Sequence, residues 1–143
     1  MNKIQVIFIL LTFSFVGIGS VSARDYTQVK EDCDRLKEAS PEALLDPPPG
    51  YVEPVPLVRF PPDYPQNSPW RQYVCVALQF DVNERGRTEN VKILEFHPAD
   101  APSNFRYKAR DAIKKWKYSP ATQNGVPVRR EGAITVVTYE LIQ

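Results

Sequence analysis

The sequence predicts an α+β fold in which a three-stranded antiparallel sheet of β-β-α-β order has a helix packed on one face. Three patterns predict it: an alternating apolar run at 73–82, a helical apolar stripe at 105–116 and a second apolar strand pattern at 133–142. A small sheet that buries one face against a helix is a stable two-layer arrangement. An N-terminal helix and a Pro-rich extension precede this unit.

Residues 1–23 have the features of a cleaved secretory signal peptide. Lys3 gives a positive start, Ile4–Gly19 is mostly apolar, and small residues follow at 21–23, as a signal peptidase requires. The alternative is an uncleaved membrane anchor, but 16 residues that include three polar ones are fewer than the roughly 20 that span a bilayer. We therefore expect export.

The composition argues against several classes of function. Removal of Lys3 leaves 17 basic and 17 acidic residues in a mature chain of 120, whereas nucleic-acid binding relies on excess basic charge. The G-x-S-x-G, phosphate-loop and H-E-x-x-H motifs are absent, so we expect no enzyme. His97 is the only histidine, and with two cysteines it falls short of a zinc site. We expect no cofactor.

Residues 24–40 are predicted to form the N-terminal helix, with its periodic part from Asp25 to Ala39. One apolar stripe recurs at helical spacing along it: Tyr26, Val29, Cys33 and Leu36. The Pro-rich segment at 41–69 holds ten of the fourteen prolines, which excludes a regular helix or a central strand. Its interspersed apolar residues are too many for a free linker, so we expect part of it to lie against the domain.

The run from Tyr73 to Val82 is the clearest strand. Its even-numbered residues, from Val74 to Val82, form one apolar face, and its odd-numbered residues form the other. A turn ending at Gly86 leads to a return strand at 87–96. The apolar residues of the return strand change parity, which a β-bulge near Leu94 reconciles.

The second helix is predicted from Ser103 or Asn104 to Lys117. Its core-facing stripe consists of Phe105, Ala109, Ala112, Ile113 and Trp116. This stripe and the even face of the first strand would form the main core, so we interpret Trp116 as a core residue. A final strand is predicted from Ala133 to Ile142.

Cys33 and Cys75 are the only cysteines, and in an exported chain they suggest one disulfide bond. Two free buried thiols are the alternative. Cys33 lies on the stripe of the N-terminal helix, and Cys75 lies on the strand face that points away from the main core. A bond between them would lay that helix across the second face of the sheet, and this is our hypothesis.

Residues 61–143 also carry a family pattern. It comprises Tyr64-Pro65, the strand from Tyr73, the run KKWKYSPA at 114–121, NGVPV at 124–128 and the closing strand ITVVTYEL. This combination resembles the C-terminal domain of TonB, the protein that couples an inner-membrane motor to outer-membrane receptors. The resemblance implies the same topology, a periplasmic location in a Gram-negative envelope, and an association with TonB-dependent transport.

The resemblance also implies where a partner would bind. In that family, receptor peptides pair with the final strand, and the segment around Tyr-Pro contributes contacts. The matching candidates are Asp63, Tyr64, Pro65, Gln66, Ile134, Val136, Thr138 and Glu140. From the residues alone, an edge strand can accept an added strand. The alternatives are that the final strand meets the N-terminal segment or a second copy of the chain, and that Tyr64 only packs.

Two features differ from a full energy transducer. The signal sequence looks cleavable, and a Pro-rich stretch of 29 residues reaches only about 90 Å when fully extended. Two functions therefore remain. The first is a periplasmic module that binds an outer-membrane receptor or other envelope protein by strand addition. The second is a structural or assembly protein of the envelope, with no energy transduction, that dimerises through the final strand.

Overall fold

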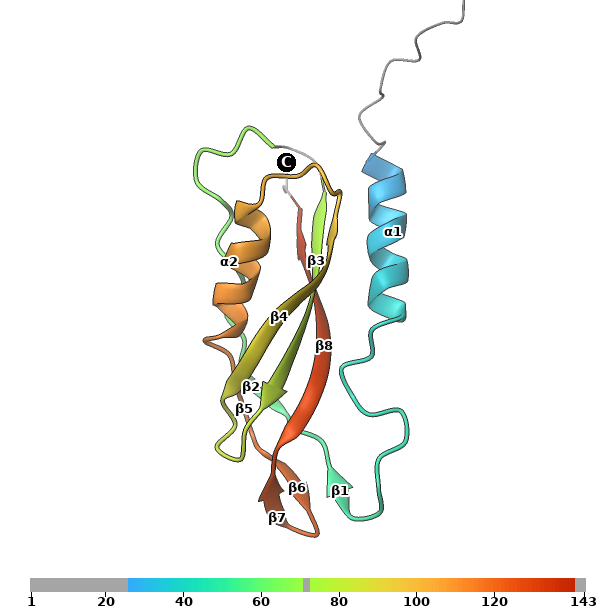
Figure 1. Ribbon diagram of the computed structural model, residues 1–143, viewed down its shortest axis with the longest axis vertical. Helices are drawn as coiled ribbons and strands as arrows, with labels where there is room; N and C mark the ends of the chain where they lie inside the picture. The colour runs from blue at the N-terminus through green and yellow to red at the C-terminus, as the bar shows by residue number, and fades with distance from the viewer. Residues whose placement is uncertain (1–25, 71–72, 141–143) are drawn as a thin grey trace, which may run out of the picture.

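A three-stranded antiparallel sheet is the centre of the computed structural model, which describes residues 26–70 and 73–140. Its strands lie in the order β4 (Thr88–His97), β3 (Val74–Val82) and β8 (Arg130–Tyr139). With α2 (Asn104–Ile113) between β4 and β8 in the chain, the predicted β-β-α-β fold class is confirmed (Figure 1). The predicted signal peptide lies outside the described residues.

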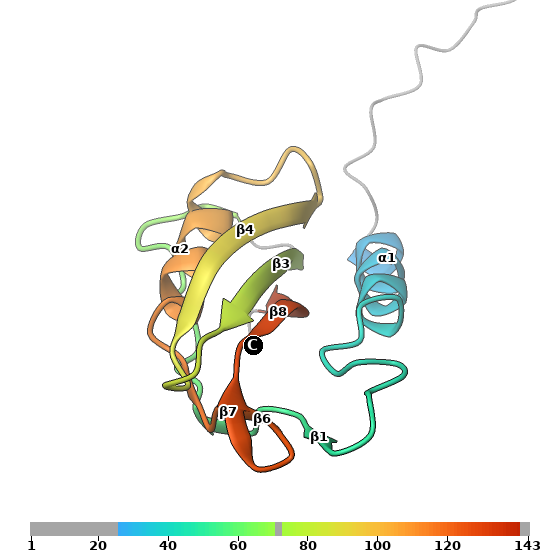
Figure 2. The same ribbon diagram turned by 60° about the horizontal axis from the view of Figure 1, so that its bottom comes forward.

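The helix α2 covers one face of this sheet, and the main core lies between them (Figure 2). The even-numbered side chains of β3 are fully buried there, as the alternation predicts. Phe80 meets Trp116 edge to face, with ring centroids 6.1 Å apart, a favourable geometry for aromatic pairs. Trp116 is only 7% exposed, which confirms its interpretation as a core residue.

The second helix is shorter than the sequence predicts. It ends at Ile113 rather than Lys117. The Ile113 carbonyl accepts hydrogen bonds from the Thr88 hydroxyl and from the backbone N–H of Trp116, three residues on, so the helical hydrogen-bond pattern does not continue. The next residues form β5 (Lys117–Tyr118), which pairs with β2 (Pro56–Val58). Strand pairing to a distant segment therefore overrides the helical periodicity.

The predicted bulge in the return strand is present at Leu94. Ala77 pairs with Glu95 and Leu78 pairs with Ile93, so Leu94 is the extra residue, and its side chain is 50% exposed. The last strand begins at Arg130, earlier than the predicted start at 133, because Val82 pairs with Arg130 beyond an irregularity in the ladder.

The Pro-rich segment lies against the domain, as its apolar content predicts. Besides β2, it contributes β1 (Tyr51–Val52), which pairs with β6 (Ala121–Gln123). A hairpin through Asn124 and Gly125, both at positive φ, joins β6 to β7 (Val126–Val128). These short strands were not predicted from the sequence, because two or three residues give no periodic signal.

The helix α1 (Tyr26–Glu38) lies on the opposite face of the central sheet from α2 (Figure 2). Its bounds match the predicted periodic part within one residue at each end. Among residues 26–70 and 73–140, the structure contains no helix with the length and apolarity of a membrane span.

Candidate functional site

The outer side of β8 is the one feature of the central sheet that meets the sequence-based expectation of a binding edge. Within the described residues, β8 pairs with β3 on one side and with no strand on the other. Ile134, Val136 and Thr138 pair with Gln79, Ala77 and Cys75, respectively. Cross-strand partners share a face, so these three candidates lie on the α1 side of the sheet.

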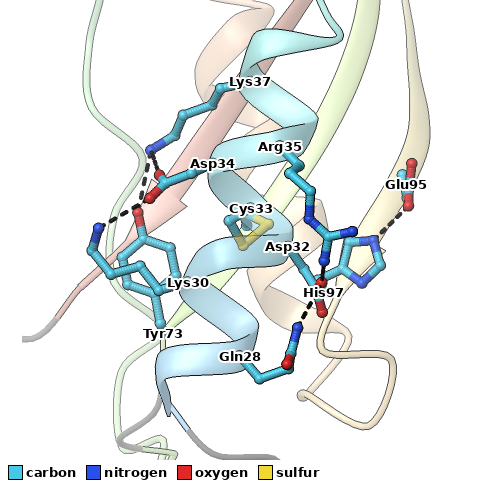
Figure 3. The surroundings of a disulfide bond; sticks show 11 residues. Gln28, Lys30, Asp32, Cys33, Asp34, Arg35, Lys37, Tyr73, Glu95 and His97 are labelled. Atoms are coloured by element: carbon cyan, nitrogen blue, oxygen red, sulfur yellow. Dashed lines mark hydrogen bonds and ion pairs between the residues drawn. A yellow bond between two sulfur atoms is a disulfide. The ribbon is translucent and has the colours of Figure 1, made fainter.

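The helix α1 is fixed over this second face by the disulfide bond between Cys33 and Cys75, the bond that we expected (Figure 3). Both cysteines are fully buried, and they form a small cluster with Val29 and Tyr73. Val136 packs against the same cluster. Val136 thus packs against the N-terminal helix, which is the alternative considered for the final strand, and it is only partly exposed.

The two flanks of α1 face the two outer strands of the sheet. On one flank, Asp32 and Arg35 line a hollow together with Glu95 and His97 of β4. Lys30, Asp34 and Lys37 occupy the other flank (Figure 3). Because β4 and β8 lie on opposite sides of β3, this second flank lies on the β8 side of the helix.

The β8-side flank of α1 is a polar network. The Lys30 ammonium lies 3.1 Å from a carboxylate oxygen of Asp34, and Lys37 donates to the Tyr73 hydroxyl at 3.3 Å. The hydrogen bond to Asp34 raises the pKa of Lys30, and Glu140, just past β8, adds a smaller contribution. Hydrogen bonds from Lys30 and Lys37 hold the pKa of Asp34 below its usual range. Both lysines therefore remain cationic at neutral pH.

The other flank of the β8 edge is aromatic. The ring of Tyr64 lies 5.2 Å from Phe105 and 6.2 Å from Tyr139, edge to face in both contacts. The Tyr64 hydroxyl donates to the Trp70 carbonyl at 2.6 Å. Burial, with a smaller effect of the Asp63 charge, raises the pKa of Tyr139. Tyr64 therefore has a packing role beside the last strand, whatever further contact it makes.

The two predicted groups of residues thus lie beside the same strand but on opposite faces of the sheet, with Tyr64 on the α2 side and the three β8 candidates on the α1 side. Asp63 and Gln66 are exposed beside Tyr64, whereas Pro65 is buried. On the strand, Ile134 and Thr138 are partly exposed, and Glu140 is exposed just past its end. The two groups are 63–66 and 134–140 in the sequence, and the Tyr64–Tyr139 ring contact joins them.

Sequence reasoning missed the residues that connect the extension to this strand. The Arg130 side chain is 7% exposed, and its Nε lies 3.3 Å from a carboxylate oxygen of Glu53. It also donates to the Glu42 carbonyl at 3.0 Å. The only signal was the high density of apolar residues in the Pro-rich segment, which does not identify a partner for a buried arginine.

The described residues contain no group of three or more His, Cys, Asp or Glu side chains that could hold a metal ion. The chemistry that the β8 edge offers is instead that of backbone hydrogen bonding. The outer N–H and C=O groups of β8, which pair with no strand in the described part of the chain, lie between an aromatic flank and a charged flank.

Comparisons with known proteins point to one family. The family model described as "Gram-negative bacterial TonB protein C-terminal" matches residues 61–141. The protein TonB of Salmonella typhimurium is 38% identical over 63 residues, which are 43% of this chain and 25% of that relative. The chain therefore spans about a quarter of the length of the curated relative. The solution structure of the Pseudomonas aeruginosa TonB C-terminal domain is 26% identical in sequence and superposes with a TM-score of 0.52. The match covers 70% of this chain and 93% of the Pseudomonas aeruginosa chain.

Proposed function

The chain belongs to the family of Gram-negative TonB C-terminal domains, and we propose that it is a periplasmic protein-binding module that engages an extended segment of an envelope protein by strand addition to β8. The family is associated with TonB-dependent transport. An outer-membrane receptor is therefore the first partner to test, and another envelope protein is the second.

The observation that carries this proposal is the outer side of β8, with which no strand of residues 26–70 or 73–140 pairs. An edge strand can pair its free backbone groups with an added strand, which gives affinity, while neighbouring side chains give specificity. The residues that matched the family pattern at 63–66 lie beside this same edge through Tyr64. The proposal does not include coupling to an inner-membrane motor.

The proposed location rests on residues 1–23 and on the disulfide bond. Disulfides persist in oxidising compartments such as the bacterial periplasm, and the Cys33–Cys75 bond suits that location. Mass spectrometry of the protein purified from cells tests the signal peptide, because cleavage after Ala23 predicts a chain that begins at Arg24.

The central experiment is photocrosslinking in Gram-negative cells with a photoreactive amino acid at Ile134. This position lies on β8 but, unlike Val136, outside the cluster under α1. Lys115 is the control, because it is exposed, follows the end of α2 and is not part of β8.

We expect an outer-membrane or other envelope protein to be captured from Ile134 and not from Lys115. Capture of a second copy of the chain would instead favour the structural alternative, a homodimer through β8. Capture of nothing from Ile134, or of the same proteins from Lys115, would contradict binding at the edge.

A further inference from the structure

The helix α1 lies outside the part of the chain that matches the family model, residues 61–141, yet it borders the proposed binding edge. It packs over β3 and β8 and reaches β4. The disulfide bond holds it in that place. Any strand that pairs with β8 must therefore lie next to a helix that the matched region does not contain.

The dimensions bring an added strand within reach of α1. Neighbouring strands lie about 4.8 Å apart, so a strand outside β8 would lie about 10 Å from β3. A helix with its side chains is about 10–12 Å across. Since α1 is bonded to β3 and also packs on β8, long side chains on its β8-side flank can reach toward a strand added at that edge.

The two flanks of the edge differ in chemistry. On the α2 side, the Tyr64 ring borders β8 through its contact with the buried Tyr139 of that strand. On the α1 side, the flank presents the ammonium groups of Lys30 and Lys37, with Asp34 between them and Glu140 near Lys30. Each ammonium group has three N–H donors and no acceptor. Lys30 uses one of them on Asp34, and Lys37 uses two, on Asp34 and on the Tyr73 hydroxyl, so the remaining donors favour acceptor side chains on a neighbour.

We infer that α1 forms part of the binding site, and that it selects an extended partner segment whose alternate side chains are hydrogen-bond acceptors facing α1. The intervening side chains of that segment are apolar and face Tyr64, because successive side chains of a strand point to opposite faces. This inference rests on the proposed function, since it requires a strand at β8.

The test extends the crosslinking experiment on the full chain. The photoreactive residue is placed at Lys30, on the β8-side flank of α1, and at Arg35, on its β4-side flank. We expect the partner captured from Ile134 to be captured from Lys30 and not from Arg35. If Ile134 captures an envelope protein and Lys30 does not, α1 has no part in the site, although the proposed function stands.

Sequencing of the crosslinked peptides tests the alternation. With a third probe at the exposed Asp63, we expect Lys30 and Asp63 to capture partner residues of opposite parity in one segment. Capture of residues of the same parity, or of different segments, would overturn the inferred orientation. If Ile134 captures no envelope protein, the proposed function fails and this inference fails with it.

Reversing the charge of each lysine tests whether α1 selects acceptor side chains on the partner. The substitutions Lys30→Glu and Lys37→Glu should each lower the yield of the Ile134 adduct about threefold, the size expected for one exposed ionic contact. Arg35→Glu is the matched control and should leave the yield unchanged. Thiol titration verifies that the disulfide is intact in each variant. An unchanged yield of the Ile134 adduct in both lysine variants would then overturn the inference that Lys30 and Lys37 select acceptor side chains.

Discussion

The two faces of the central sheet are each covered by one helix, but the helices are held in different ways. On the α2 face, a continuous core joins β3, α2 and the segment after it, with Phe80, Phe105 and Ile113 fully buried. On the α1 face, the buried cluster consists of Val29, Cys33, Tyr73 and Cys75, with Leu36 and Val136 packed against it.

The two helices depend on different interactions for their positions. A buried large apolar side chain contributes about 1.5–3 kcal/mol, so the α2 face is stabilised mainly by packing. The α1 cluster buries few such side chains, and an isolated helix of 13 residues is marginal in water. The covalent bond is therefore the main constraint on the position of α1.

The largest expected effect is on the α2 face. Phe80→Ala should lower the free energy of unfolding by about 3–5 kcal/mol, because it removes a buried ring and leaves a cavity beside Trp116. Urea denaturation measures the change. Leu45→Ala is the control, since that side chain is 88% exposed and should change stability by less than about 0.5 kcal/mol. A loss below about 1 kcal/mol at Phe80 would contradict the described core.

Removal of the disulfide should affect α1 more than the sheet. The bond closes a loop of 42 residues, which corresponds to about 4 kcal/mol in the chain-entropy model. In the Cys33→Ala/Cys75→Ala variant, hydrogen exchange should show loss of protection throughout α1, while amides of β3 remain protected. Reduction of the native chain should give the same pattern. Retained protection in α1 would show that packing alone holds it.

A smaller effect is expected where the extension meets β8. Arg130→Ala should lower the free energy of unfolding by about 2–3 kcal/mol, because it removes charge-assisted hydrogen bonds from a buried position near Glu53. Arg85→Ala, at an exposed turn, is the matched control. Equal stability of the two variants in urea denaturation would mean that the extension is not anchored through Arg130.

The smallest effect should appear as a pH dependence on the polar part of the α1 face. Burial alone would raise the pKa of Asp81, but hydrogen bonds from Asn90, Gly132 N and Arg129 outweigh it and leave the pKa below its usual range. A carboxyl group with a depressed pKa stabilises the folded state at any pH above the pKa that it has in the unfolded chain, about 3.9. This stabilisation is lost as the pH falls through the lower pKa of the folded state.

Urea denaturation between pH 7 and pH 3 measures this dependence. The stability difference between the native chain and Asp81→Asn should be largest near neutral pH and should shrink below about pH 4. Asp46→Asn, in an exposed loop, is the control and should show no such trend. A constant difference across this range would show that the charge of Asp81 does not contribute.

The sequence predicted the parts of the fold that have a regular period. Ten alternating residues identified β3 and its two faces, and the parity change located the bulge at Leu94. It did not predict the end of α2 at Ile113 or the strands β1, β2, β5, β6 and β7. These depend on pairing between segments far apart in the chain, for which a local period carries no information.

The candidate site was predicted less completely than the fold. The family pattern indicated the segments 63–66 and 134–140, and the structure places them at one edge. The pattern did not indicate that Val136 packs under α1, or that Lys30 and Lys37 flank the edge. The position of α1 across the sheet decides both.

Hydrophobic periodicity and composition can be read from the sequence, and they predicted the fold class, the two faces of β3 and, as a hypothesis, the bond between Cys33 and Cys75. Three features came from the tertiary structure: β8 lies at one of the two edges of the central sheet, Tyr64 packs beside it on the α2 side, and the charged flank of α1 lies beside it on the other side. Those features arise when elements far apart in the chain pack together, and their relative rotation is set by the whole interface.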